Sequence, residues 1–86
     1  MDLSNITISR ADLPHFFSLL GNRGVVFGAT VRKRTNGEVR EFNGRVEEVD
    51  MENDLAVINE TNDGGYRSVA FEGVQQLRAF GNKFDI

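Results

Sequence analysis

The chain contains no cysteine, and this absence excludes disulfide bonds, thiolate catalysis and cysteine-based zinc sites. It is consistent with a cytoplasmic protein, because stable disulfides belong mainly to secreted proteins. No apolar run approaches the ~20 residues of a membrane-spanning helix. The polar start Met1-Asp2-Leu3-Ser4 is unlike a secretory signal. We therefore expect a cytoplasmic protein that has no membrane partner.

Residues that could carry catalysis are also scarce. The single histidine, His15, lies beside Phe16 and Phe17, a position typical of a packing residue. The glycines between positions 21 and 28 do not form the G-x-G-x-x-G pattern of a phosphate-binding loop. The acids at positions 50, 52 and 54 alternate as in a calcium loop, but the glycine turn and terminal glutamate of that motif are missing. We expect no enzyme activity, no cofactor and no metal site.

Charge is distributed unevenly along the chain, although its net value is only −3. The segment 23–45 holds six basic and two acidic residues, which gives +4. The segment 46–63 holds seven acidic residues and no basic ones, which gives −7. Such a division produces a dipolar surface, which can steer one charged partner or two different ones.

The dipeptide Asn36-Gly37 between two β-rich runs predicts a β-hairpin closed by a two-residue type I′ turn. That turn sets a register with a basic tip and an apolar base. The predicted cross-strand pairs are Thr35 with Glu38, Lys33 with Arg40, Arg32 with Glu41, Val31 with Phe42, Ala29 with Gly44 and Phe27 with Val46. Alternation along the strands then places five apolar side chains on one face, namely Phe27, Ala29, Val31, Phe42 and Val46.

The remaining pattern predicts one domain over residues 1–86, of the all-β class, with a five-stranded SH3-like barrel and a short N-terminal helix. Residues 1–10 are expected to form a tail or edge strand. A helix over 12–21 begins at Asp12, ends at Gly21-Asn22 and packs through Phe16, Phe17, Leu19 and Leu20. The barrel spans 25–80, with strands at 25–34, 39–46, 55–58, 66–70 and 74–80 and a tight turn at 71–73. The expected core is Phe27, Val31, Phe42, Val46, Leu55, Val57, Val69 and Leu77.

Two stretches, 31–40 and 65–69, carry a resemblance to a known group of proteins. Their sequences are Val-Arg-Lys-Arg-Thr-Asn-Gly-Glu-Val-Arg and Gly-Tyr-Arg-Ser-Val. In this combination the chain resembles small SH3-like barrel proteins encoded by bacteriophages and related mobile elements. The resemblance covers roughly half of the chain and implies a fold but no assigned activity. A phage origin would place the protein in the host cytoplasm.

Two classes of binding function remain open. The first is a non-enzymatic module that acts on a host or phage protein, as an inhibitor or regulator, through strand edges and charged loops. Its acidic contact loop would contain Glu47, Glu48, Asp50, Glu52 and Asp54. Self-association into a homo-oligomer through strand edges belongs to the same class.

The alternative is a nucleic-acid-binding protein that contacts phosphates through the basic 32–40 hairpin. The residues expected to bind are Arg32, Lys33, Arg34, Arg40, Arg45, Tyr66 and Arg67. The predicted opposition of Lys33 and Arg40 favours an anionic ligand, because like charges directly opposite destabilise a hairpin. The sequence pI near 5.0 argues against a general nucleic-acid binder.

Overall fold

The computed structural model describes residues 5–33, 35–61 and 64–86. Within these ranges the chain is mostly β-strand with one short α-helix, as expected, and none of the helices described is long and apolar enough to cross a membrane. The elements are β1 (Asn5–Thr7), η1 (Arg10–Asp12), α1 (Leu13–Arg23), β2 (Phe27–Arg32), β3 (Val39–Asp50), β4 (Leu55–Glu60), β5 (Tyr66–Ala70), η2 (Phe71–Gly73), β6 (Val74–Ala79) and β7 (Asn82–Asp85), where η marks a 3₁₀ helix.

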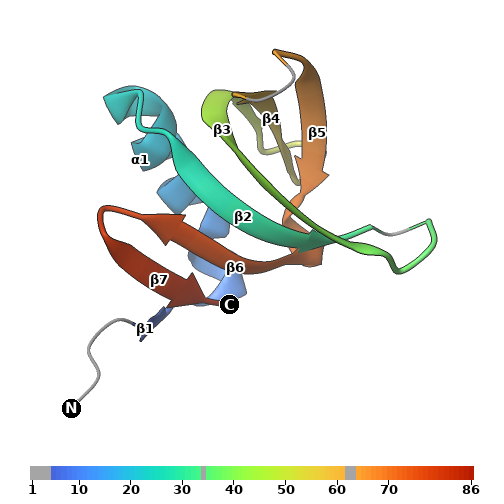
Figure 1. Cartoon of the computed structure of the whole chain (residues 1–86), viewed down its shortest axis with the longest axis horizontal. Coiled ribbons are helices and arrows are strands. Elements are labelled where there is room, and N and C mark those ends of the chain that lie inside the picture. The colour runs from blue at the N-terminus through green and yellow to red at the C-terminus, as the bar shows by residue number, and fades with distance from the viewer. Residues whose placement is uncertain (1–4, 34, 62–63) are drawn as a thin grey trace.

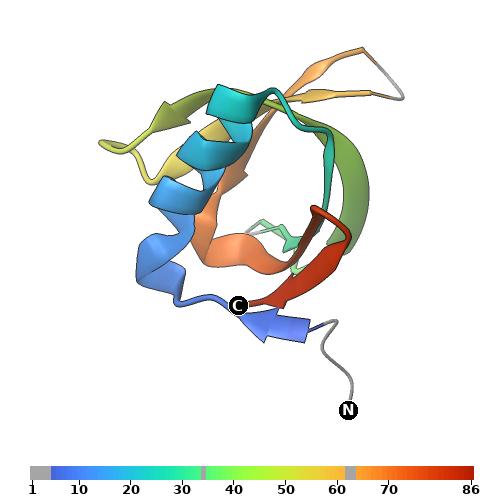
Figure 2. The same ribbon diagram turned by 90° about the vertical axis from the view of Figure 1, so that its left-hand side faces the viewer.

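The described strands form a single seven-stranded sheet in the order β1-β7-β6-β2-β3-β4-β5. The expectation of a five-stranded barrel is therefore wrong, because the sheet has seven described strands and does not close into a barrel. The chain reverses at Phe80 and Gly81, both with positive φ, and adds β7 to β6, after which β1 adds to β7 in parallel. The sheet curls strongly, and α1 lies along its open side (Figures 1 and 2).

The β2–β3 hairpin is present, but its turn differs from the prediction. Val31 pairs with Arg40 rather than with Phe42, so the register is shifted by two residues. The loop is longer than two residues because Lys33 N–H donates to Glu38 O and Gly37 N–H donates to Lys33 O. Asn36 does not adopt a positive φ; its side-chain oxygen instead accepts from Glu38 N–H at 2.9 Å. A shift of two residues leaves every side chain on its predicted face.

The buried residues confirm which face of this hairpin packs into the core, but the buried face of β4 differs from the prediction. Phe27, Phe42, Val69 and Leu77 are buried, and Val31 and Val46 are partly buried against them. In β4, however, Ala56 and Ile58 are buried, whereas Leu55 and Val57 are only half-buried. The run Leu-Ala-Val-Ile is apolar throughout, so it contains no alternation from which the buried face can be predicted.

Helix α1 begins one residue later and ends two residues later than predicted. Asp12 precedes it without a side-chain capping bond, and Gly24 ends it with a φ of 63°. Phe17 and Leu20 are fully buried, and the ring of Phe17 contacts those of Phe27 and Phe71 at centroid distances of 5.7 and 5.4 Å. Leu19, expected on the packed face, is instead 41% exposed. The helix thus fills the concave side of the sheet through one side chain in every third or fourth position.

Candidate functional site

A groove of about 670 Å³ lies between the distal part of the β2–β3 hairpin and the segment formed by β5 and η2. Its apolar surface comes from Val31, Phe42, Val69 and Ala70. Five cationic side chains line it, namely those of Arg10, Arg32, Lys33, Arg40 and Arg67. Among the lining residues that the structure describes, Glu72 is the only acid. The groove therefore combines an apolar floor with a strongly positive rim.

One wall of the groove is an arm of the hairpin that extends beyond the rest of the sheet. Strand β2 pairs with β6 only up to Val31, and β3 pairs with β4 only from Gly44 onward. Beyond those points the two strands pair with each other alone, and the arm projects away from α1 (Figure 1). Gly73 of η2 approaches the base of the arm so closely that a Cβ there would lie 2.5 Å from Arg32 O. This contact brings η2 and the arm together as the two sides of the groove.

Arg67 is the cation held most firmly in the groove. Its Nη2 donates to Glu60 Oε2 at 3.0 Å, and its guanidinium lies 5.5 Å from the centroid of the Phe42 ring. The side chains of Arg67 and Glu60 are only 23% and 12% exposed. The buried Arg67 Nε has no acceptor among the described residues. An ion pair buried to this extent fixes the orientation of the guanidinium better than an exposed ion pair does.

Arg10 of η1 enters the groove from a distant part of the sequence. Its Nη1 donates to two backbone carbonyls, Phe71 O at 2.7 Å and Val74 O at 3.2 Å. These contacts join the segment before α1 to η2. Sequence reasoning missed Arg10 because its partners are backbone atoms 61 and 64 residues away, and no local pattern indicates such a contact.

The cationic side chains of the arm make fewer hydrogen bonds and ion pairs than Arg10 and Arg67 do. Lys33 and Arg40 make no side-chain hydrogen bond or ion pair with any other described residue, whereas Arg32 Nη1 donates to Gly37 O at 3.3 Å. The predicted cross-strand pairing of Lys33 with Arg40 does not occur, since Arg40 faces Val31. Both side chains nevertheless line the same groove, so their positive charges add there.

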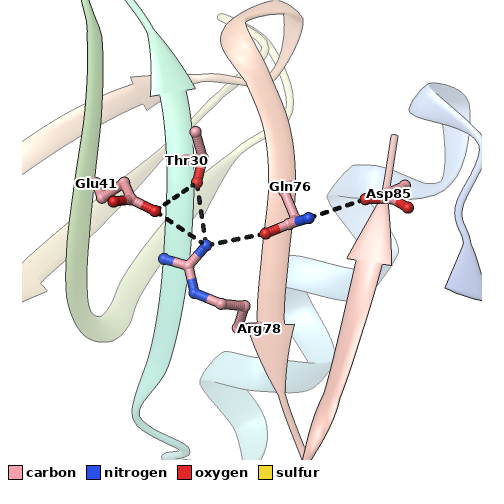
Figure 3. A network of polar contacts seen from close by, with 5 residues as sticks. All are labelled: Thr30, Glu41, Gln76, Arg78 and Asp85. Atoms are coloured by element: carbon pink, nitrogen blue, oxygen red, sulfur yellow. Dashed lines mark hydrogen bonds and ion pairs between the residues drawn. The ribbon is translucent and has the colours of Figure 1, made fainter. Parts of the chain in front are cut away.

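Arg78 differs from the arm cations because its guanidinium is bonded to other side chains of the sheet. Its Nη1 donates to Thr30 Oγ1 at 3.0 Å and to Gln76 Oε1 at 3.2 Å, and it lies 3.7 Å from Glu41 Oε1 (Figure 3). Gln76 in turn donates to Asp85, so the network joins β3, β2, β6 and β7. Arg78 is thus a structural cation, in contrast to the cations of the arm.

The other residues predicted to bind lie elsewhere. Arg45 and Tyr66 both flank Asn59 in the sheet, and they lie on the strand faces opposite to Phe42 and Arg67. Tyr66 is 70% exposed there. Arg34 lies outside the described residues. The structure therefore brings together Arg32, Lys33, Arg40 and Arg67 from the predicted set, and not Arg45 or Tyr66.

The acidic residues do not form the loop that the sequence predicted. Glu47, Glu48 and Asp50 belong to β3, and only Glu52 and Asp54 lie in the turn at 51–54. None of these five described side chains lines the groove. Asn53 donates to the Asp50 carboxylate from its side chain and its backbone, at 2.8 and 3.1 Å, and these bonds lower the pKa of Asp50 below its ordinary value. Asp50 therefore stabilises the turn.

No cluster of metal-ligating side chains exists among the described residues. No protein-family model, no curated protein and no solved structure matches the chain.

Proposed function

We propose that this protein is a non-enzymatic binding module that holds an acidic segment of a partner protein in its basic groove. The observation that carries the proposal is the pair of arm cations Lys33 and Arg40, which no acceptor in the described chain engages, placed beside an apolar floor. Exposed charges at the rim of a contact surface steer and orient a partner, and an apolar floor supplies burial. In line with the resemblance to small SH3-like phage proteins, we propose a host or phage protein as the partner and inhibition or regulation as the outcome.

Nucleic acid is the second candidate, and the five cations around the groove favour it. Single-stranded nucleic acid is usually held by stacking its bases on aromatic side chains as well. Within the groove the aromatic ring is that of Phe42, which is only 7% exposed and lies beneath Arg67. Tyr66 points to the opposite face of β5. The groove thus offers phosphate contacts but no accessible stacking platform among its described residues, which favours a protein partner.

The test is fluorescence anisotropy with two labelled anionic probes, an acidic peptide of alternating glutamate and valine and a decathymidine oligonucleotide, each over a salt titration. The double variant Arg32→Ala/Arg40→Ala removes two groove charges. At about 0.5–1 kcal/mol for each ionic contact, it should weaken peptide binding by about five- to thirtyfold and flatten the salt dependence.

The matched control is Arg45→Ala/Lys83→Ala, which removes the same charge from exposed positions outside the groove. It should change affinity by less than about twofold, because Arg45 lies on the strand face opposite to Arg67, Lys83 belongs to β7, and neither lines the groove. Equal losses in the two double variants would show that net charge, and not the groove, governs binding. Tighter binding of the oligonucleotide than of the peptide would favour the second candidate.

A further inference from the structure

Strand β5 forms one end of the sheet, and its described residues pair with β4 alone. An edge of this kind offers a row of backbone donors and acceptors to another strand. The opposite end of the sheet is β1, which is only three residues long. Strand β5 is therefore the longer of the two end strands of the described sheet.

The hydrogen-bond pattern shows which groups of β5 point outward. Glu60 N–H donates to Gly65 O, and Phe71 N–H donates to Asp54 O, so these pairs are bonded across the β4–β5 ladder. Bonded and non-bonded pairs alternate in an antiparallel ladder. Arg67 and Val69 therefore bond to β4, whereas the backbone N–H and C=O groups of Tyr66, Ser68 and Ala70 point away from the sheet.

The open edge of β5 borders the basic groove. Ser68 and Ala70, two of the residues with outward-pointing backbone groups, line the groove together with Arg67 and Val69. The hairpin arm forms the facing wall, with Arg32, Lys33 and Arg40. A polypeptide lying in the groove can thus reach backbone donors on one side and cationic side chains on the other.

We propose that the occupant of the groove is an extended acidic peptide segment that adds to β5 as an eighth strand. This inference rests on the proposed function and specifies its partner. Side chains alternate along a strand, so every second residue of the segment would face the same side as Arg67 and Val69. Carboxylates at these positions would meet the cations, and the residues between them would lie on the opposite face of the added strand. The length of β5 sets the bound segment at about five residues.

The inward-facing Arg67 disfavours a second copy of the chain as the occupant. Two β5 edges paired with each other would place two Arg67 guanidinium groups in one groove, where the arm cations already repel further positive charge. Like charges on neighbouring strands destabilise the pairing. An acidic segment instead lowers the repulsion among the groove cations.

The experiment uses the labelled glutamate–valine peptide and the variant Ser68→Pro, with Ser68→Ala as its control. Proline at position 68 removes the outward N–H and places its ring in the path of an added strand, and an edge strand tolerates it because that N–H has no partner in the sheet. We expect Ser68→Pro to weaken peptide binding at least ~10-fold, and Ser68→Ala to leave it within about twofold. The decathymidine probe should bind both variants equally, because phosphate contacts need no edge amide.

Amide hydrogen exchange on the wild-type chain gives a second readout that needs no variant. Saturating peptide should slow exchange at Ser68 and Ala70, which exchange fast without it. Arg67 and Val69, which bond to β4, should exchange slowly in both states and serve as internal controls. Unchanged exchange at Ser68 under saturating peptide would overturn the inference, as would equal peptide affinities of the proline and alanine variants.

The two proposals can fail separately. If Arg32→Ala/Arg40→Ala weakens peptide binding but Ser68→Pro does not, the groove binds acidic segments by charge, and strand addition is wrong. If neither change affects binding, both proposals are wrong. A doubled mass in sedimentation, lost in Ser68→Pro but not in Ser68→Ala, would assign the edge to a second copy and also overturn the acidic-segment inference.

Discussion

The ion pair between Arg67 and Glu60 should contribute far more to stability than the pair between Arg78 and Glu41. Arg67→Met keeps the aliphatic packing on Phe42 but leaves the Glu60 carboxylate, 12% exposed, without its cation. Exposed pairs contribute about 0.2–1 kcal/mol, whereas loss of one member of a fully buried pair costs about 3–5 kcal/mol. The intermediate burial of this pair places the expected loss at about 2 kcal/mol. For a domain of this size that corresponds to a fall in Tm of about 8–16 °C.

Urea unfolding of Arg67→Met, Glu60→Gln and the double variant isolates the coupling between the two side chains. We expect a coupling energy of about 1–2 kcal/mol. The matched cycle with Arg78→Met and Glu41→Gln tests a pair 3.7 Å apart whose acid is 72% exposed, and its coupling should stay below about 0.5 kcal/mol. Equal couplings in the two cycles would refute the claim that burial holds Arg67 in place in the groove.

Two further predictions concern the frame around the groove. Gly44→Ala should destabilise the fold by about 1–3 kcal/mol in urea unfolding, because its Cβ would lie 2.6 Å from Asn59 O. The control Gly65→Ala, with no atom within 4 Å of its Cβ, should change the stability by less than about 0.5 kcal/mol. Similar losses at both positions would contradict this steric argument. The lowered pKa of Asp50 means that its contribution to stability is present above its unfolded pKa and is lost as the pH falls through the folded value. Asn53→Ala should raise the pKa of Asp50 in an NMR titration, and an unchanged titration curve would show that Asn53 is not the cause.

Local patterns were sufficient for the features that depend on neighbouring residues. The hairpin between β2 and β3 and the buried face of Phe27, Ala29 and Phe42 follow from alternation, which a register shift of two residues does not alter. The turn at 71–73 was predictable because Phe71-Glu72-Gly73 is too short and irregular for a strand, and the strand after it begins at Val74 as predicted. Four of the seven predicted binding residues line one groove because they lie on the arm or on the strand across from it.

The features that sequence reasoning missed depend on contacts between distant segments. Strand β7 contains a single buried residue, Phe84, so it has no alternation to reveal it. In β3, an irregularity between Val46 and Glu48 shifts the register with β4, and the sequence has no glycine there to indicate a bulge. The place of Arg10 in the groove depends on carbonyl groups of η2 and β6, which only the assembled sheet brings near.

The parallel pairing of β1 with β7 has a consequence for the order of folding. It joins Asn5 to Lys83, and the bonds of Arg10 to Phe71 and Val74 span almost as much of the chain. Forming contacts between such distant residues costs more loop-closure entropy than forming the antiparallel hairpins from β2 to β5, whose strands are joined by short turns. The segment before α1 should therefore dock last on folding and open first in native-state fluctuations. Each opening would release Arg10 from the groove while the hairpin arm and the β5 edge stay in place.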